Sequence, residues 1–229
     1  MKFFIGIDDA GRGPVVGPMF LAGVLVDDGK KKKFKKLGIK DSKQLFPVER
    51  KKLFKEIKKL CLDFKIVSSS ASEIDHLIQT GTNLNKIEAQ KTAKIINSLI
   101  KPIDKKMDVQ IVVDCPSVNI VAWKNYLSRH IKKNEKVKLF LKCEHKADIN
   151  HVEAAAASIL AKVSRDSEIE KIKKEIGIDF GSGYPSDPET IDFLKKYGDK
   201  FKDYGIFRKT WMTWKTHMKK KSQKKLFEY

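Results

Sequence analysis

The sequence predicts an α/β fold in which helices flank a mixed β-sheet and the last helices form an appendage. Two apolar segments typical of strands, residues 3–8 and 19–26, come before any helical pattern. Strand and helix patterns then alternate, as they do in a sheet covered by helices. After residue 187 the pattern is helical only. We therefore expect a large domain over residues 1–186 and a helical extension with a basic tail over 187–229.

The first two strands are expected to pair, because a segment rich in Gly and Pro joins them. Residues 30–36 follow and contain six lysines. We expect an exposed basic loop there, since a block of like charges repels itself. Pro47 can open a helix, and residues 50–60 place their apolar side chains at helical spacing with lysines between them.

The rest of the chain is divided by the same periodicities. The other expected strands are 64–71, 111–114 and 137–142, and the other expected helices are 83–100, 117–131, 151–176, 187–197 and 211–221. The helix from residue 151 has the clearest pattern. Asn150 and Glu153 have the spacing of a capping box, and the small residues of AAAASILAKV predict a closely packed face.

The charge of the chain indicates its class of partner. The 229 residues include 48 Lys and Arg against 29 Asp and Glu, a net charge of +19. Such a balance predicts a polyanionic partner, with nucleic acid first. An anionic membrane surface is the alternative, but it calls for an amphipathic basic helix, and the basic runs here are short and broken.

Other features exclude whole classes of protein. No apolar stretch approaches the ~20 residues that span a bilayer, so we expect no membrane protein. Asp8, Asp9 and Arg12 interrupt the start too early for a signal peptide. The three cysteines are widely spaced, which favours neither disulfides nor a Cys-rich zinc site. We expect a cytoplasmic protein.

Four aspartates stand at the ends of predicted elements. Asp8 and Asp9 end a strand, Asp114 ends another, and Asp148 precedes a helix. If they converge, their mutual repulsion calls for divalent cations, and an oxygen-only donor set selects Mg²⁺ or Mn²⁺ over Zn²⁺. The alternative is that each caps a turn or lies near a helix dipole. Spacing alone does not decide between the two.

Glycines gather directly after the first strand. Gly11, Gly13 and Gly17 are not spaced as in a dinucleotide-binding loop, and a strand instead of a helix follows them. Glycines let backbone N–H groups approach a ligand, so with Arg12 between two of them the segment suits a sugar or phosphate group. A tight hairpin turn is the alternative.

A series of motifs in order along the chain carries a family resemblance. The motifs are GIDDAGRGPVVGP (6–18), DSKQL (41–45), NLNKIEA (83–89), VVDCPSVN (112–119), KADINHVEAAAASILAKVSRD (146–166), GSGYPSDP (181–188) and RKTW (208–211). The series resembles ribonuclease HII, the type 2 ribonucleases H, and NLN and RKTW are most similar to the archaeal branch. The resemblance covers essentially the whole chain and implies a ribonuclease H-like sheet with flanking helices.

The resemblance also implies roles for particular residues. The metal-binding and catalytic acids of the family fall on Asp8, Asp9, Asp114 and Asp148. Residues that contact the ribonucleotide and its surroundings fall on Gly11, Arg12, Gly13, Lys43 and Tyr184, with Tyr184 at the junction between RNA and DNA. The second acid is usually Glu, and Asp9 is shorter by one methylene, roughly 1.5 Å. This departure favours Mn²⁺, which tolerates irregular oxygen ligation better than Mg²⁺.

By the same resemblance, the chain is an endonuclease that uses two divalent ions, Mg²⁺ or Mn²⁺. It would hydrolyse the RNA strand of RNA/DNA hybrids and cut DNA duplexes 5′ to embedded ribonucleotides, leaving 3′-OH and 5′-phosphate ends. We expect a monomer. A sliding clamp stays open as a partner, although the terminal LFEY is too short to identify a clamp-binding peptide.

Two rival functions belong to other classes. A non-catalytic nucleic-acid-binding protein explains the charge but not four aspartates at element ends. Another nuclease or a transposase on the same fold explains the aspartates but not the Gly-Arg-Gly loop with a distant Gly-Tyr.

Overall fold

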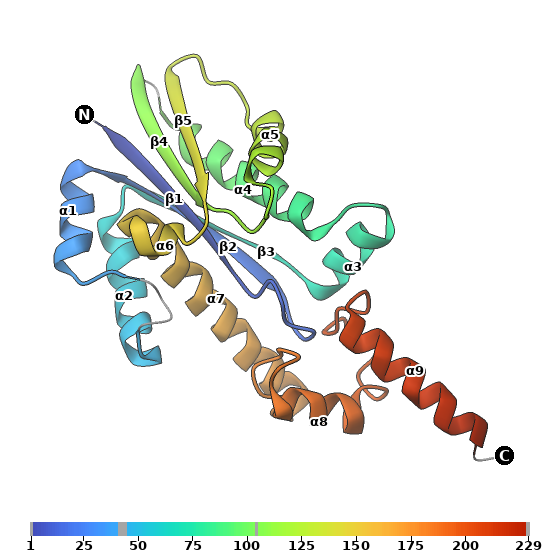
Figure 1. Ribbon diagram of the computed structural model, residues 1–229. Helices are drawn as coiled ribbons and strands as arrows, with labels where there is room; N and C mark the ends of the chain where they lie inside the picture. The colour runs from blue at the N-terminus through green and yellow to red at the C-terminus, as the bar shows by residue number, and fades with distance from the viewer. Residues whose placement is uncertain (1, 41–44, 104, 228–229) are drawn as a thin grey trace. The chain divides into compact units, whose positions relative to one another are not determined.

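The computed structural model describes residues 2–40, 45–103 and 105–227 (Figure 1). These residues form two compact units. Unit 1 is formed by the described residues of Met1–Ala10, Phe20–Ser68 and Leu84–Ser164, and unit 2 by those of Gly11–Met19, Ser69–Asn83 and Arg165–Tyr229. The expected catalytic domain over residues 1–186 and helical extension over 187–229 stay a prediction.

Unit 1 contains a mixed sheet, as the sequence predicts. In the described part of the chain its order is β3-β2-β1-β4-β5. The strands are β1 (Phe3–Ala10), β2 (Met19–Asp27), β3 (Asp63–Ser69), β4 (Met107–Asp114) and β5 (Val137–Glu144). β1 is antiparallel to β2 and parallel to β4, and β4 is parallel to β5. The carboxyl ends of β1 and β4 therefore lie side by side at one edge.

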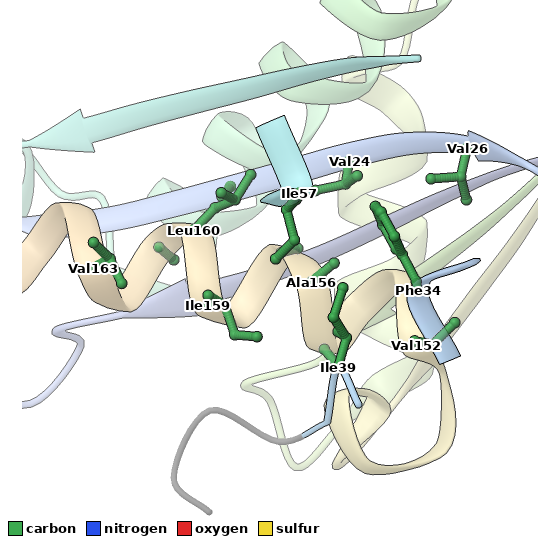
Figure 2. Close-up of a cluster of buried hydrophobic side chains, with 14 of the residues drawn as sticks. Val24, Val26, Phe34, Ile39, Ile57, Val152, Ala156, Ile159, Leu160 and Val163 are labelled. Carbon is green, nitrogen blue, oxygen red and sulfur yellow. The ribbon is translucent and has the colours of Figure 1, made fainter. Parts of the chain in front are cut away.

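Helices cover both faces of this sheet (Figure 1). One face packs on α1 (Asp28–Lys36), α2 (Pro47–Leu60) and α7 (Val152–Ile176), and the other is covered by α4 (Leu84–Ile100) and α5 (Ile120–His130). Figure 2 shows the first of these contacts, in which Val24 and Val26 of β2 face Phe34, Ile57 and Ala156 from the three helices. The apolar side chains that the sequence places at helical spacing in α2 and α4 thus lie on the faces that these helices bury.

The prediction of a basic loop at residues 30–36 is wrong, because this segment lies in helix α1. Asp27 caps the helix by accepting a hydrogen bond from the Lys30 N–H at 2.8 Å. Phe34 anchors it and is fully buried. The Lys31 ammonium lies 2.9 Å from a Glu153 carboxylate oxygen and 4.0 Å from the centre of the Phe4 ring. One buried aromatic residue and these contacts outweigh the repulsion between the lysines.

The start of the long helix also differs from the prediction. Asn150 does not form a capping box with Glu153, because it ends a separate short helix, α6 (Ala147–Asn150). Its side-chain amide donates to Glu144 at 3.4 Å. The Glu153 carboxylate is instead paired with Lys31. The predicted helix itself is confirmed as α7, which starts at Val152.

Unit 2 has its own apolar core. The helices of unit 2 include α3 (Ala71–Gln79), α8 (Pro188–Tyr197) and α9 (Met212–Phe227). The buried Trp214 stacks on Phe207 with ring centres 4.5 Å apart, in a core that also includes Val15 and Phe193. The predicted C-terminal helices are confirmed, whereas α3 occupies a segment for which no helix is expected. Among the described residues, no helix is long and apolar enough to span a bilayer.

β1 and α7 approach each other without intervening side chains at Gly6. A Cβ added to Gly6 would lie 2.1 Å from the carbonyl carbon of Glu153 and 2.3 Å from the amide nitrogen of Ala154. Both atoms belong to the backbone and cannot move aside. Glycine is therefore required at this point of the central strand.

We expect Gly6→Ala to lower the free energy of unfolding by about 3 kcal/mol, the upper part of the range for overpacked cores. In a protein of this size, the melting temperature should fall by about 10 °C. Gly29→Ala is the matched control, since its nearest neighbour would be a side-chain oxygen 3.3 Å away. Thermal unfolding followed by circular dichroism measures both changes. Equal melting temperatures for Gly6→Ala and the parent would contradict the close contact.

Candidate active site

Three of the predicted acids line one pocket in unit 1. Asp8 and Asp9 end β1, and Asp114 ends the neighbouring β4. The parallel register pairs Ile7 with Val113. Asp8 and Asp114, the next residue on each strand, therefore lie side by side. The pocket is lined by Ile7, Asp8, Asp9, Leu21, Glu88, Thr92, Val113, Asp114, Pro116 and Trp123. The parallel pairing of β1 and β4 thus brings these three carboxylates together.

The electrostatic environment of Asp8 is strained. Burial of its side chain raises the pKa of the carboxyl well above its usual value, and the charges of Asp9 and Asp114 raise it further. Hydrogen bonds from the Ser158 hydroxyl and the Asp9 backbone N–H act in the opposite direction. Asp8 is therefore held in a fixed orientation at a point where negative charge has accumulated.

Asp148 lies on the short helix α6 and is buried. The backbone N–H of the preceding residue, Ala147, donates to Asp114 Oδ1 at 2.9 Å. This bond fixes the first turn of α6 to the end of β4. Lys146, just before the helix, has a φ of 58°, which turns the chain sharply into it. Asp148 is thus placed by a helix that is anchored to one of the pocket acids.

The donor chemistry of the pocket fits a hard divalent cation. Within residues 2–40, 45–103 and 105–227, no three Asp, Glu, His or Cys side chains surround one point as metal ligands do. Asp8, Asp9 and Asp114 nevertheless offer only carboxylate oxygens, which suit Mg²⁺ and Mn²⁺. A bound cation would also relieve the repulsion that raises the pKa of Asp8. The carboxylates thus form a site whose charge calls for a counter-ion.

Glu88 is a further acid of the pocket to which sequence reasoning assigned no role. It lies on α4 and is 1% exposed. Two signals in the sequence could have identified it. Glu88 lies in NLNKIEA, a motif of the family resemblance, and it is next to the apolar stripe of a predicted helix. Trp123 of α5 fixes the start of the same helix, because its indole N–H donates to the Asn85 carbonyl at 2.9 Å.

The residues predicted to contact a sugar or phosphate come together in unit 2. One edge of the Tyr184 ring lies beside Gly13, where an added Cβ would be 3.5 Å from Tyr184 Cε1. Gly11 has a φ of 85°, a conformation that favours glycine. The N–H groups of Val15 and Val16 both donate to the Gly183 carbonyl, at 2.8 and 3.2 Å. These bonds hold the Gly11–Gly13 loop beside the segment that carries Tyr184.

Two buried arginines hold these segments, and sequence reasoning assigned them no role. Arg165 donates to the Ser182 carbonyl, and its guanidinium carbon is 5.2 Å from the centre of the Tyr184 ring. Arg208 donates to the carbonyls of Gly11 and Arg12 at 2.6 and 2.7 Å. Both arginines lie in motifs of the resemblance, SRD and RKTW, which was the available signal. Lys43 lies outside the described residues.

Comparisons with known proteins agree with the fold and with the motifs. The sequence model of the family described as Ribonuclease HII matches residues 5–214. The ribonuclease HII of Pyrococcus furiosus is 46% identical over 210 residues, which cover 91% of this chain and 88% of that protein. The likeness therefore extends over nearly the full length of both proteins.

Solved structures give the same result. The crystal structure of ribonuclease H2 from Pyrococcus horikoshii OT3 has a TM-score of 0.82 and 35% identity, covering 95% of this chain and 98% of that one. RNase HII in the PCNA:RNase HII complex from Archaeoglobus fulgidus has a TM-score of 0.77 and 35% identity, covering 91% and 95%. By sequence and by fold, the chain belongs to the ribonuclease HII family, and it is therefore an enzyme of the nuclease class of hydrolases.

Proposed function

We propose that the enzyme hydrolyses the RNA strand of RNA/DNA hybrids and cuts DNA duplexes on the 5′ side of embedded ribonucleotides, leaving 3′-OH and 5′-phosphate ends. The observation that carries this proposal is the pocket in which Asp8, Asp9 and Asp114 gather within a chain of net charge +19. The basic chain attracts the polyanionic nucleic acid. Divalent cations held by the carboxylates can neutralise the charge of the carboxylates and of a phosphodiester placed beside them. The membership of the chain in the ribonuclease HII family gives the class of substrate.

The proposed ligands of two divalent ions are Asp8, Asp9, Asp114 and Asp148. Such ions would lower the pKa of the attacking water and stabilise the leaving 3′ oxygen. The protein's own contribution is orientation. Ser158 and the Asp9 N–H hold the Asp8 carboxylate, and the Ala147 N–H holds that of Asp114. Preorganised carboxylates need little rearrangement as the reaction proceeds.

Recognition of the sugar is proposed for Gly11, Arg12, Gly13 and Tyr184. Gly13 is exposed and has no side chain, so a ribose or its phosphate can approach the backbone. The aromatic ring of Tyr184 lies beside this glycine and supplies a hydroxyl. A loop that hydrogen-bonds a 2′-OH discriminates strongly against deoxyribose, whose approach leaves its polar groups unpaired. Lys43 is proposed to contact the substrate backbone on the resemblance alone.

One protein partner can be proposed from the comparisons. The RNase HII of Archaeoglobus fulgidus was solved in a complex with PCNA, and this chain is 35% identical to it. We therefore propose PCNA as the partner to test for this enzyme. The monomeric state and the cytoplasmic location stay predictions.

Asp148→Asn should reduce cleavage of a continuous RNA/DNA hybrid in Mg²⁺ by at least about 10² to 10³-fold, because it removes a group that stabilises transition-state charge. Adding EDTA to the parent should abolish cleavage. The matched control is Asp108→Asn, an exposed aspartate at the opposite end of β4 from Asp114. Normal turnover by Asp148→Asn, or cleavage in EDTA, would refute the proposed site.

Asp9 predicts an effect on the choice of metal. We expect the parent to cleave faster in Mn²⁺ than in Mg²⁺, because Mg²⁺ demands near-ideal octahedral geometry that the shorter side chain meets less readily. Asp9→Glu should raise the Mg²⁺ rate and narrow the difference. Rates measured over a titration of each metal test this. A parent that prefers Mg²⁺, with Asp9→Glu slower in both metals, would show that the pocket is built around the shorter acid.

Tyr184→Ala should impair cleavage at a lone ribonucleotide more than cleavage within a continuous hybrid. The physical reason is that only the lone ribonucleotide has a deoxyribose as its 3′ neighbour, so its recognition depends on the junction. The two kcat/KM values are compared for the parent, the variant and Tyr204→Ala, an exposed tyrosine in the same unit. Equal losses on both substrates would assign Tyr184 to packing instead of junction sensing.

A further inference from the structure

Arg208 is fully buried and contacts residues 11–17, which we call the glycine loop. Its Nε donates to the Gly17 carbonyl at 3.0 Å, its Nη1 to the Arg12 carbonyl at 2.7 Å and its Nη2 to the Gly11 carbonyl at 2.6 Å. The guanidinium carbon is 4.9 Å from the centre of the Trp211 ring. The planar fork of one arginine is thus matched to three carbonyls of a single loop.

These bonds determine which way the loop presents its amide groups. The described peptide bonds are trans, and in a trans peptide the C=O and N–H groups point in opposite directions. Because the carbonyls of Gly11 and Arg12 face Arg208, the N–H groups of Arg12 and Gly13 point away from it. The loop therefore offers two successive amide donors, those of Arg12 and Gly13, and Gly13 is exposed beside the Tyr184 ring.

The charge of Arg208 strengthens this arrangement. Hydrogen bonds from a charged donor are roughly twice as strong as neutral ones. A carbonyl that accepts such a bond becomes more polarised, and the N–H of the same peptide becomes a better donor. A positive charge buried behind the loop also attracts an anionic group in front of it. Successive amides turned to one side form an anion-binding concavity.

We propose that Arg208 is a positioning residue that fixes the Arg12 and Gly13 amides toward the 2′-OH and phosphate of a ribonucleotide. The proposal rests on the proposed function, because it assigns Arg208 to the sugar recognition described there. A purely structural Arg208 would stabilise unit 2 without affecting the preference for ribose. The preference for ribose over deoxyribose therefore distinguishes the two roles.

The test uses Asp148→Asn as the background, so that cleavage of the bound substrate is at least about 10²-fold slower. Kd is measured by fluorescence anisotropy for two duplexes that differ only in a single 2′-OH. We expect the background protein to prefer the ribonucleotide duplex about tenfold or more. Adding Arg208→Lys, which keeps the charge but loses the fork, should abolish most of this preference. Adding Arg129→Lys, a change at an exposed arginine of α5, should leave it unchanged.

The outcomes separate the two hypotheses. A background protein without preference for ribose contradicts the proposed function, whereas an unchanged preference in a folded Arg208→Lys variant overturns the role of Arg208. Amide NMR spectra of the background protein decide the matter if Arg208→Lys does not fold. The Arg12 and Gly13 signals should shift more with the ribonucleotide duplex than with all-DNA. Equal shifts with both duplexes would overturn the proposal.

Discussion

The contact between β1 and α7 at Gly6 is the constraint on which the rest of the structure depends. Two backbones meet there without a side chain between them, 2.1 Å from where a Cβ would lie. The small residues of the first turns of α7 make this approach feasible, and the buried alanines from Ala154 to Ala157 continue it. The central strand is thereby fixed, and its carboxyl end carries Asp8 and Asp9. The glycine loop begins two residues later in the chain.

The chain as a whole is basic, but its candidate active site is acidic. The surface is strongly basic, with a net charge of +19 for the chain, whereas the pocket at the end of β1 concentrates carboxylates. Burial and mutual repulsion raise the pKa of Asp8, so the folded state holds a destabilising site. Proteins keep such strain where it has a function, and here the function proposed is to hold divalent cations beside a phosphodiester. In unit 2 the buried arginines Arg165 and Arg208 donate hydrogen bonds to backbone carbonyls.

Much of the fold could be predicted because its signals are local. The apolar runs of β1 and β2 and the helical spacing of α2, α4 and α7 all appear in short windows of sequence. The prediction of a loop at residues 30–36 was wrong because the single buried Phe34 and the cap from Asp27 are weak local signals beside six lysines. Likewise, Asn150 fits a capping box by spacing, but Glu153 is engaged by Lys31, which is 122 residues away.

In the candidate site, too, residues within motifs could be predicted, whereas contacts between residues far apart in the chain could not. The motifs identified Asp8, Asp9, Asp114, Asp148, the glycine loop and Tyr184, and their roles stay predictions. Arg208 could not be assigned from the sequence, because its partners lie 191 to 197 residues earlier. Glu88 was missed because an acid within a helix is usually solvated, and only the folded sheet shows that it lines the pocket.

The central claim is that this chain selects a ribose and cuts beside it. The most direct measurement is to map the cut in a DNA duplex that contains a single ribonucleotide, using the full chain in Mg²⁺ and resolving products to one nucleotide. We predict one cut on the 5′ side of the ribonucleotide, and a cut that moves by one position when the ribonucleotide moves by one. Cuts that stay in place when the ribonucleotide moves would contradict the account.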